Sequence, residues 1–238
     1  MRFAKTQRGS KMYKFETHFH TSECSACSVS TAKEMIYALK QKGYAGVVLT
    51  NHFYHGNTAI NRRIPWKDFV GAYKENYLEA KNYGESLGMK VFFGIEEGYG
   101  GGKEFLIFGV SPDILIENPE FNNMEIEEKV DFIRNNGGIT VCAHPFRDRF
   151  YISNPDTPPN PDLFDGIEVY NQFNRPEENQ KAFDFAKKHG KIMTSGGDVH
   201  AAEDVGFSGI DFSVKINSYE DFIAALKNGD YKIIKNEN

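Results

Sequence analysis

The 238-residue sequence contains few cysteines and no long apolar run. Its three cysteines, Cys24, Cys27 and Cys142, are too few for a disulfide framework, which is typical of a protein from a reducing compartment. Cys24 and Cys27 form a single CxxC pair, and without a second pair downstream this spacing argues against a closed zinc knuckle. No apolar stretch approaches the roughly 18 residues that would predict a membrane span.

The sequence also lacks an excess of basic residues. It has 28 Lys and Arg against 33 Asp and Glu, which gives a net charge of −5 at pH 7. Because broad nucleic-acid binding requires clustered positive charge to neutralise phosphates, this balance argues against nucleic acid as a partner. Residues 1–11 are basic but contain no apolar segment of the kind found in signal peptides. We therefore expect a cytoplasmic protein with no membrane partner, and nothing in the sequence indicates its oligomeric state.

Short β-branched or aromatic runs alternate with amphipathic segments along the chain. The spacing of Ala32, Met35, Ile36 and Leu39 predicts a helix over 31–42, between strands at 13–20 and 46–50. Such alternation implies parallel strands covered by helices, and we expect one barrel-like α/β domain over residues 1–238. Further strands are expected at 91–95, 105–108, 139–143, 166–170, 191–194, 212–216 and 231–234, with further helices at 66–87, 123–135, 176–190 and 218–228, a glycine-rich turn at 98–102 and a proline-rich loop at 146–165.

Polar side chains that bind metals gather at the ends of the predicted strands, the edge where barrel active sites form. His18 and His20 lie two apart on a strand and share one face, and Asp198 and His200 repeat that spacing. Imidazoles with carboxylates form the ligand set of Zn, Mn or Fe, and burying these groups unpaired would be costly. The candidate metal ligands at this edge are His18, His20, His52, Glu96, His144, Asp198 and His200.

Six short segments carry these residues in order: 16–22 (ETHFHTS), 49–52 (LTNH), 94–96 (GIE), 143–145 (AHP), 167–171 (IEVYN) and 195–200 (SGGDVH). Together they resemble the motifs of the polymerase and histidinol phosphatase (PHP) superfamily, over about residues 14–200. The resemblance implies a single distorted (β/α)7 TIM-like barrel that holds two or three divalent ions and hydrolyses phosphate esters. For this sequence we expect one to three divalent ions per chain.

The same resemblance implies a distribution of ligands. One ion would take His18, His20, Glu96 and Asp198, a second would share Glu96 and take His144, and a third would take His52 and His200.

Three positions depart from the family pattern. Asn51 replaces an Asp, and Ser25 and Ala26 stand where a His or Asp is expected after the first histidine pair. Leu106 stands where many members have a histidine on the fourth strand. The nearest replacements are Glu23 or Cys27 for the second position and Glu104 for the third.

Phosphate recognition also requires cations beside the metals. Arg147 and Arg149, just after His144, are the preferred candidates for binding substrate, ahead of Arg62, Arg63 and Lys103 on other loops. The motif residue Glu168 is a further candidate for substrate binding. For catalysis itself we expect roles for Arg147, Asp198 and His200.

The expected reaction is hydrolysis of a small phosphomonoester by metal-activated water, with no nucleophilic residue. Three alternatives remain open: a phosphodiesterase or exonuclease acting on nucleotide ends, an amidohydrolase-type C–N hydrolase, and a non-catalytic metal-binding domain. Two histidines stand outside the motifs. His55 is either an additional ligand or a solvated loop residue, and His189, beside Gly190, is expected to cap the end of a helix.

Overall fold

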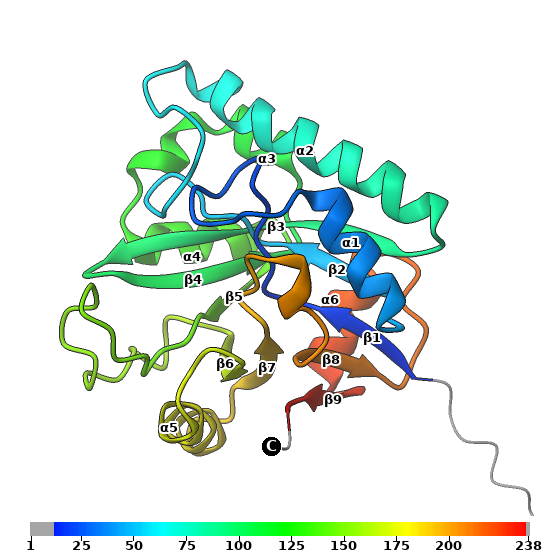
Figure 1. The fold of residues 1–238 in the computed structure, drawn as a ribbon. Helices are drawn as coiled ribbons and strands as arrows, with labels where there is room; N and C mark the ends of the chain where they lie inside the picture. Colours follow the sequence, from blue (N-terminus) through cyan, green and yellow to red (C-terminus); the bar gives the residue numbers. More distant parts are fainter. Residues whose placement is uncertain (1–11, 237–238) are drawn as a thin grey trace, which may run out of the picture.

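The computed structural model describes residues 12–236 and contains one mixed sheet covered by helices (Figure 1). The basic stretch 1–11, which was one argument for expecting a cytoplasmic protein, lies outside the described residues. The strands are β1 (Tyr13–Glu16), β2 (Gly46–Leu49), β3 (Lys90–Gly100), β4 (Lys103–Phe108), β5 (Ile139–Cys142), β6 (Gly166–Asn171), β7 (Ile192–Gly196), β8 (Gly209–Phe212) and β9 (Tyr231–Ile234). The helices are α1 (Ala32–Gln41), α2 (Trp66–Ser86), α3 (Pro112–Glu117), α4 (Ile126–Asn135), α5 (Pro176–Lys188) and α6 (Tyr219–Asn228), with short 3₁₀ helices η1 (Pro119–Asn123) and η2 (Ala202–Asp204).

The nine strands follow the order β7-β6-β5-β4-β3-β2-β1-β8-β9 across the sheet. The pairs β1–β2, β2–β3, β5–β6 and β6–β7 are parallel. β4 is antiparallel to both of its neighbours, and so is β8. Two strands of the described sheet therefore run opposite to the other seven. The prediction of a barrel-like α/β fold is confirmed, whereas the predicted count of seven β/α units is not.

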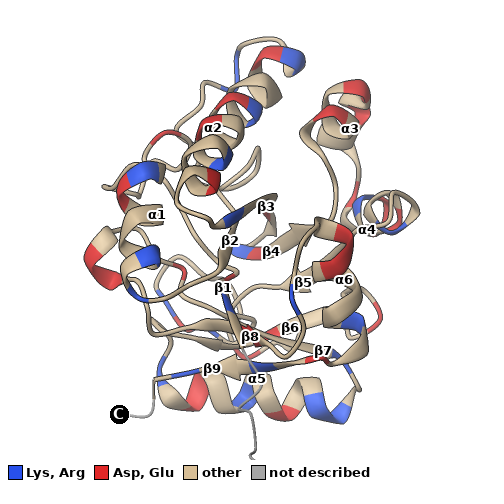
Figure 2. Cartoon of the chain, turned by 90° about the vertical axis from the view of Figure 1, so that its right-hand side faces the viewer, with Lys and Arg blue, Asp and Glu red and all other residues tan. Residues whose placement is uncertain are grey.

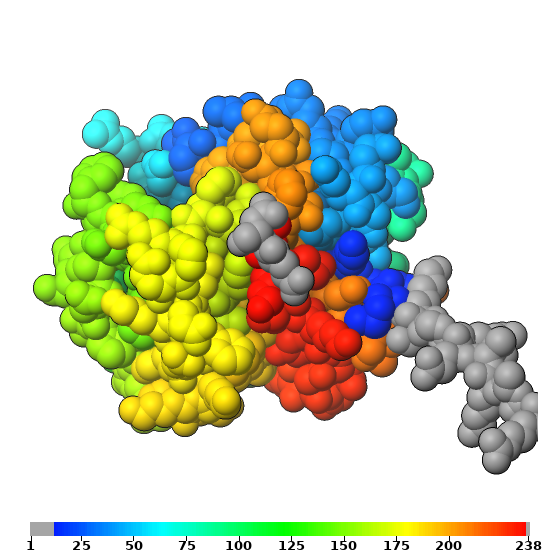
Figure 3. Space-filling model, turned by 60° about the horizontal axis from the view of Figure 1, so that its bottom comes forward, coloured from blue at the N-terminus to red at the C-terminus, as the bar shows by residue number. Residues whose placement is uncertain are grey.

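Hydrogen bonds from side chains draw the two edges of the sheet together. Ser195 Oγ on β7 accepts from Gly209 N at 3.1 Å and donates to the Ile234 carbonyl at 2.5 Å. Thr17 Oγ1 donates to the Ser195 carbonyl at 2.7 Å. Figure 3 shows the result from below, where the red C-terminal segment lies against the yellow segment of α5. The sheet is thus a nearly closed barrel held at its seam by a serine.

Helix ends follow the sequence signals closely. Thr31 and Glu34 form the predicted capping box at the start of α1. Pro176 opens α5, and His189 is its C-terminal cap, as predicted, followed by Gly190 in the left-handed region at φ +62°. These local signals fix where each helix begins and ends, and thereby how the loops at the sheet edge are presented.

Phe222 of α6 contacts four phenylalanines that come from four different strands. Its ring centroid lies 5.8 Å from those of Phe15 and Phe92, 5.9 Å from Phe108 and 5.3 Å from Phe212. Each fully buried phenylalanine contributes about 1.5–3 kcal/mol by leaving water. This aromatic cluster therefore fixes the positions of β1, β3, β4 and β8 relative to one another.

Several predicted bounds differ from the structure, and two of them have a local cause. β8 covers Gly209–Phe212 instead of 212–216, because Gly209 at φ +111° packs directly on the Phe15 carbonyl and starts the strand earlier. The helix predicted at 123–135 begins at Ile126, after α3 and η1, which are short and open with Pro112 and Pro119. The glycine-rich turn at 98–102 is confirmed as the tip of the β3–β4 hairpin.

Both signs of charge are interspersed along the helices that cover the sheet (Figure 2). None of the helices between residues 12 and 236 combines the length and the apolar character needed to cross a bilayer.

The seam serine gives a testable prediction for stability. Ser195→Ala leaves the buried Gly209 N–H and the partly buried Ile234 carbonyl without this partner, so we expect it to lower the free energy of unfolding by about 1–3 kcal/mol. Ser213→Ala is the matched control, because it also removes a hydroxyl bonded to a backbone carbonyl but at an exposed site, and it should change stability by less than about 0.5 kcal/mol. Urea unfolding midpoints of both variants measure the difference, and equal midpoints would contradict a role for Ser195 at the seam.

Candidate metal centre

The carboxylate of Glu96 lies at the centre of a cluster of histidines. Its Oε1 lies 3.1 Å from His18 Nε2 and 3.2 Å from His144 Nε2. Its Oε2 lies 2.8 Å from His52 Nδ1 and 3.4 Å from His20 Nε2. Glu96 itself is completely buried. A single carboxylate of β3 therefore contacts side chains that follow β1, β2 and β5.

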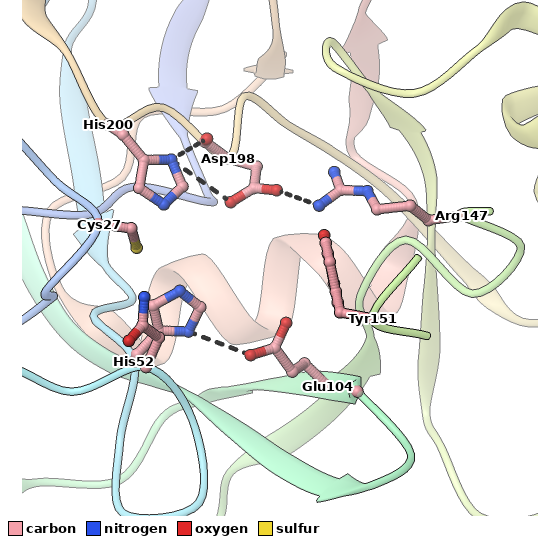
Figure 4. A pocket seen from close by; sticks show the side chains of 9 residues that line it. Cys27, His52, Glu104, Arg147, Tyr151, Asp198 and His200 are labelled. Atoms are coloured by element: carbon pink, nitrogen blue, oxygen red, sulfur yellow. Dashed lines mark hydrogen bonds and ion pairs between the residues drawn. The ribbon is translucent and has the colours of Figure 1, made fainter. Parts of the chain in front are cut away.

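Asp198 closes the cluster on the side of β7. Its Oδ1 lies 3.1 Å from His20 Nε2 and 3.4 Å from His18 Nε2. His200, two residues later, places Nδ1 2.7 Å from the Asp198 carbonyl and stacks on His20 with ring centroids 4.4 Å apart. The structure thus brings all seven predicted ligands together at one edge of the sheet. Figure 4 shows the part of this cluster that faces the surface.

Several buried ligand atoms in this cluster lack a hydrogen bond. His18 Nε2, His20 Nε2, His52 Nδ1 and Glu96 Oε2 have no hydrogen-bond partner among the described residues, although they approach one another closely. The His18 ring already donates from Nδ1 to Glu168, so in the neutral ring the lone pair on Nε2 faces two carboxylates. A cation between these atoms would satisfy all of them, which is why the residues fit a metal centre.

Four groups of three potential ligands meet within the cluster, each with its ligand atoms within 4.8 Å of one another. They are His18, His20 and Glu96; His18, His144 and Asp198; His20, His52 and His200; and His52, Glu96 and Glu104.

The charges of two of the ligands suit this role. Burial raises the pKa of the Asp198 carboxyl, but His18 and Arg147 outweigh it and hold that pKa well below its ordinary value. Burial, with the neighbouring His52, lowers the pKa of His20 well below its ordinary value. Asp198 is therefore an anionic ligand and His20 a neutral one, the forms in which each binds a cation.

Two of the ligands also have unusual backbone conformations. Among the described residues, three that are not glycine have positive φ, and His144 at +30° and Asp198 at +53° are two of them. Such conformations cost free energy and persist where the surrounding structure enforces them. The Asp198 N–H donates to the His18 carbonyl and the His144 N–H donates to Glu168, so both strained residues are fixed by hydrogen bonds.

Arg147 reaches the cluster and Arg149 does not. Arg147 is buried, and it donates from Nη1 to Asp198 Oδ2 at 2.6 Å and from Nε to Asn174 Oδ1 at 2.8 Å. Arg149 donates to Glu178 Oε1 and to the Phe173 carbonyl, which ties the loop to α5 instead. The prediction that Arg149 binds substrate is therefore not supported.

Comparison with known proteins agrees with this geometry. Residues 176–231 match a family model described as PHP-associated. The chain superposes on a two-domain protein from Bacteroides vulgatus that contains a predicted PHP-like metal-dependent phosphoesterase, with a TM-score of 0.71 and 15% identity over 97% of this chain and 66% of that one. The predicted resemblance to the PHP superfamily is confirmed.

Other solved structures share the fold at similar identity. An amidohydrolase from Chromobacterium violaceum with bound sulfate and no metal has a TM-score of 0.60 and 16% identity over 93% of this chain and 98% of that one. A lesion-specific endonuclease Q from Pyrococcus furiosus has a TM-score of 0.61 and 16% identity over 94% of this chain and 58% of that one. The chain thus spans less than two thirds of the endonuclease and of the Bacteroides protein. No curated protein sequence matches the chain.

Glu168 holds other residues of the cluster in place and is absent from the described lining of the cavity. It is completely buried, and its Oε1 accepts from His18 Nδ1 at 2.9 Å. Its Oε2 accepts from the His144 N–H and from Asn171 Nδ2, both at 3.0 Å. A Cβ on Gly196 would come within 2.5 Å of Glu168 Oε1, so the glycine of the SGGDVH motif leaves room for this contact. The structure thus places Glu168 behind the histidines, where its hydrogen bonds orient them.

The residues at the three departures from the family pattern lie in different places. Asn51 Oδ1 accepts from Thr21 N and Ser25 Oγ, so the amide holds the loop that follows the first histidine pair. Glu104 Oε1 lies 3.1 Å from His52 Nδ1, at the cluster. Glu23 is exposed and accepts from the N–H of Ala32, so it caps α1 and is set apart from the predicted ligands.

Sequence reasoning missed Tyr151 and gave Cys27 too little weight. Both line the cavity beside the cluster, where Figure 4 shows the Tyr151 ring between Arg147 and Glu104. Each lies in a loop without periodic pattern, and the signal for Cys27 was its place near Ser25 and Ala26, where the family pattern has a His or Asp. His55 pairs instead with Glu97 at 2.6 Å, outside the cluster.

The hydrogen bonds of Glu168 lead to a prediction about metal affinity. Glu168→Gln replaces an acceptor of three donors by an amide that must direct its own N–H at one of them. We expect the chain to be isolated with at least one equivalent of Zn, Mn or Fe, and the variant to bind that metal about 10–100-fold more weakly. Elemental analysis and competition with a chelator measure both values.

Glu178→Gln is the matched control, because Glu178 is similarly buried and accepts three N–H groups, from Asp148, Arg149 and Arg175. It should keep wild-type affinity for metal. Equal affinities in the two variants would contradict the positioning role of Glu168.

Proposed function

We propose that the chain is a metal-dependent phosphoesterase that acts on a small phosphomonoester and holds one to three divalent ions. The observation that carries this proposal is a cavity of about 400 Å³ that joins the metal cluster to Arg147. Its lining includes His52, Asp198 and His200 from the cluster. A cavity of this size accommodates a small molecule, and a cluster for cations beside a guanidinium suits a phosphate dianion.

Asp198 links the two halves of the site. Its Oδ1 faces the histidines while its Oδ2 accepts from Arg147, so one carboxylate sets the distance between the ion positions and the guanidinium. Divalent ions bound there would supply positive charge for phosphate oxygens and a water activated for attack on phosphorus. Arg147 Nη2 has no partner among the described residues, which leaves a donor for a phosphate oxygen.

His200 presents a reactive nitrogen to the cavity. Its Nδ1 donates to the Asp198 carbonyl, so in the neutral ring Nε2 carries a lone pair. His200 is 28% exposed in its side chain and lines the cavity. The ring is thus oriented to bind an ion or to accept a proton from an attacking water.

A second candidate function is cleavage of a phosphodiester at a nucleotide end. Phe150 is fully exposed and packs edge-on against Tyr151, which lines the cavity. Exposed aromatic rings beside a phosphate site can stack on a base. The likeness in fold to endonuclease Q agrees with this candidate, whereas the net charge of −5 favours the small monoester.

Cleavage of C–N bonds has less support. Amidohydrolase-type sites normally use a lysine or modified lysine at a strand end, and the described lining of the cavity contains no lysine.

A panel of aryl substrates separates these reactions. An aryl phosphomonoester, a bis-aryl phosphodiester and an aryl amide are each assayed with Mn, Zn or Fe, and we expect rapid turnover of the monoester alone. Asp198→Asn should abolish it, because the substitution removes both an anionic ligand and the partner of Arg147. Preferred turnover of the diester would favour the second candidate, and turnover of none with a fully loaded, folded protein would overturn the proposal.

The role of Arg147 gives a separate prediction. A guanidinium that holds phosphate oxygens persists into the transition state, so Arg147→Ala should lower kcat/KM about tenfold to a thousandfold, equivalent to about 1.4–4 kcal/mol. Arg147→Lys should recover only part of the loss. Arg149→Ala, in the same loop but directed toward α5, should leave kcat/KM within about twofold. Steady-state kinetics at measured, equal metal content would contradict the assignment if the two alanine variants behaved alike.

A further inference from the structure

The two cysteines of the CxxC pair lie in different environments. Cys24 is buried in the apolar core with Phe53 and Phe69. Cys27 is exposed and lines the cavity of the metal cluster. Figure 4 shows its sulfur on the same side of the cavity as the rings of His52 and His200. The pair therefore does not act as a unit, and Cys27 belongs with the histidines.

Hydrogen bonds fix the loop that carries this thiol to the segment of His200. The Val29 N–H and the Ser28 hydroxyl both donate to the His200 carbonyl at 2.9 Å. The loop is fixed equally well on its other side, because the His52 N–H donates to Ser25 Oγ at 3.0 Å. The position of Cys27 between the two histidines is thus set by the backbone on both sides.

The histidines on this side of the cluster are short of partners. His20, His52 and His200 bring ligand nitrogens within 4.8 Å of one another. His20 Nε2 and His52 Nδ1 are buried without a hydrogen bond to any described residue. Glu96 and Asp198 approach these nitrogens from inside the cluster. On the side of the cavity, where Ala26 offers no ligand atom, the thiol of Cys27 faces the same histidines.

We propose that the Cys27 thiolate is a metal ligand, together with His52 and His200, at the outer position of the cluster. Coordination forms a sulfur–metal bond and releases the thiol proton to solvent. Thiolate with imidazole selects borderline-soft ions, so this position should take Zn²⁺, Co²⁺ or Fe²⁺ in preference to Mn²⁺ or Mg²⁺. The assignment rests on the metal centre of the proposed function and adds the identity of one ligand and one class of ion.

The test uses the full chain produced with Co²⁺ as the metal. Wild-type protein should show an intense near-ultraviolet band from thiolate-to-cobalt charge transfer, together with the visible bands of cobalt bound to nitrogen and oxygen. Cys27→Ser should lose the near-ultraviolet band and retain the visible ones, and its weakest Co²⁺ site should bind about 10–100-fold less tightly. Cys24→Ala, which removes the buried thiol of the same pair, should keep the band.

Alkylation provides a second readout that needs no chromophore. Iodoacetamide should modify Cys27 after chelation and spare it at saturating Zn²⁺, as measured by peptide mass spectrometry. His200→Ala should abolish that protection if zinc is held by both residues.

A charge-transfer band that survives in Cys27→Ser, or equal alkylation of Cys27 with and without bound Zn²⁺, would overturn the assignment. Assays of the aryl monoester with the same preparations distinguish failure of the Cys27 assignment from failure of the proposed function. If cobalt binds and the monoester is hydrolysed without a thiolate band, only the role of Cys27 fails. If no metal binds at all, the proposed function fails with it.

Discussion

The carboxylate of Glu96 is fully buried, and its two oxygens contact four histidine side chains. A charge so far from water requires compensation, and several ligand atoms around it lack a hydrogen-bond partner among the described residues. The remaining polar residues of the core can be understood from this one constraint. They hold histidines and carboxylates in the orientation that a cation between them needs.

Three buried polar residues perform this task from different strands. Glu16 Oε1 accepts from the backbone N–H groups of Thr17, His18 and Gly197, which ties the end of β1 to the end of β7. Glu168 on β6 orients His18 and holds the backbone of His144, and Asn51 holds the loop after the first histidine pair. Burial raises the pKa of Glu16, yet its hydrogen bonds to backbone N–H groups oppose that rise. The frame of the cluster is thus polar, and the apolar packing lies behind it.

The sequence made most of the cluster predictable because parallel strands end at one edge, so His18, His52 and Asp198 had to meet there. Glu104 does not follow from that rule, because β4 runs antiparallel and its N-terminal end lies at the cluster. In loops no periodic pattern tells which side chains face inward, and for this reason Arg147 and Arg149 were both candidates for binding substrate. The (β/α)7 arrangement failed because β4 and β8 run antiparallel to their neighbours, and the pairing of β8 with β1 joins segments that are far apart in the sequence.

The same constraint connects metal binding to stability. His144 and Asp198 adopt backbone conformations that cost free energy, and they lie beside carboxylates and imidazoles that are unsatisfied without a cation. An ion that binds only the folded chain offsets both costs and shifts the folding equilibrium by mass action. The aromatic cluster around Phe222 packs phenylalanine rings from four strands and contributes no ligand atom. Loss of metal should therefore loosen the loops that follow β1, β5 and β7 before it affects the sheet. The loops that carry the candidate ligands are then also the part of the fold whose order depends most on bound metal.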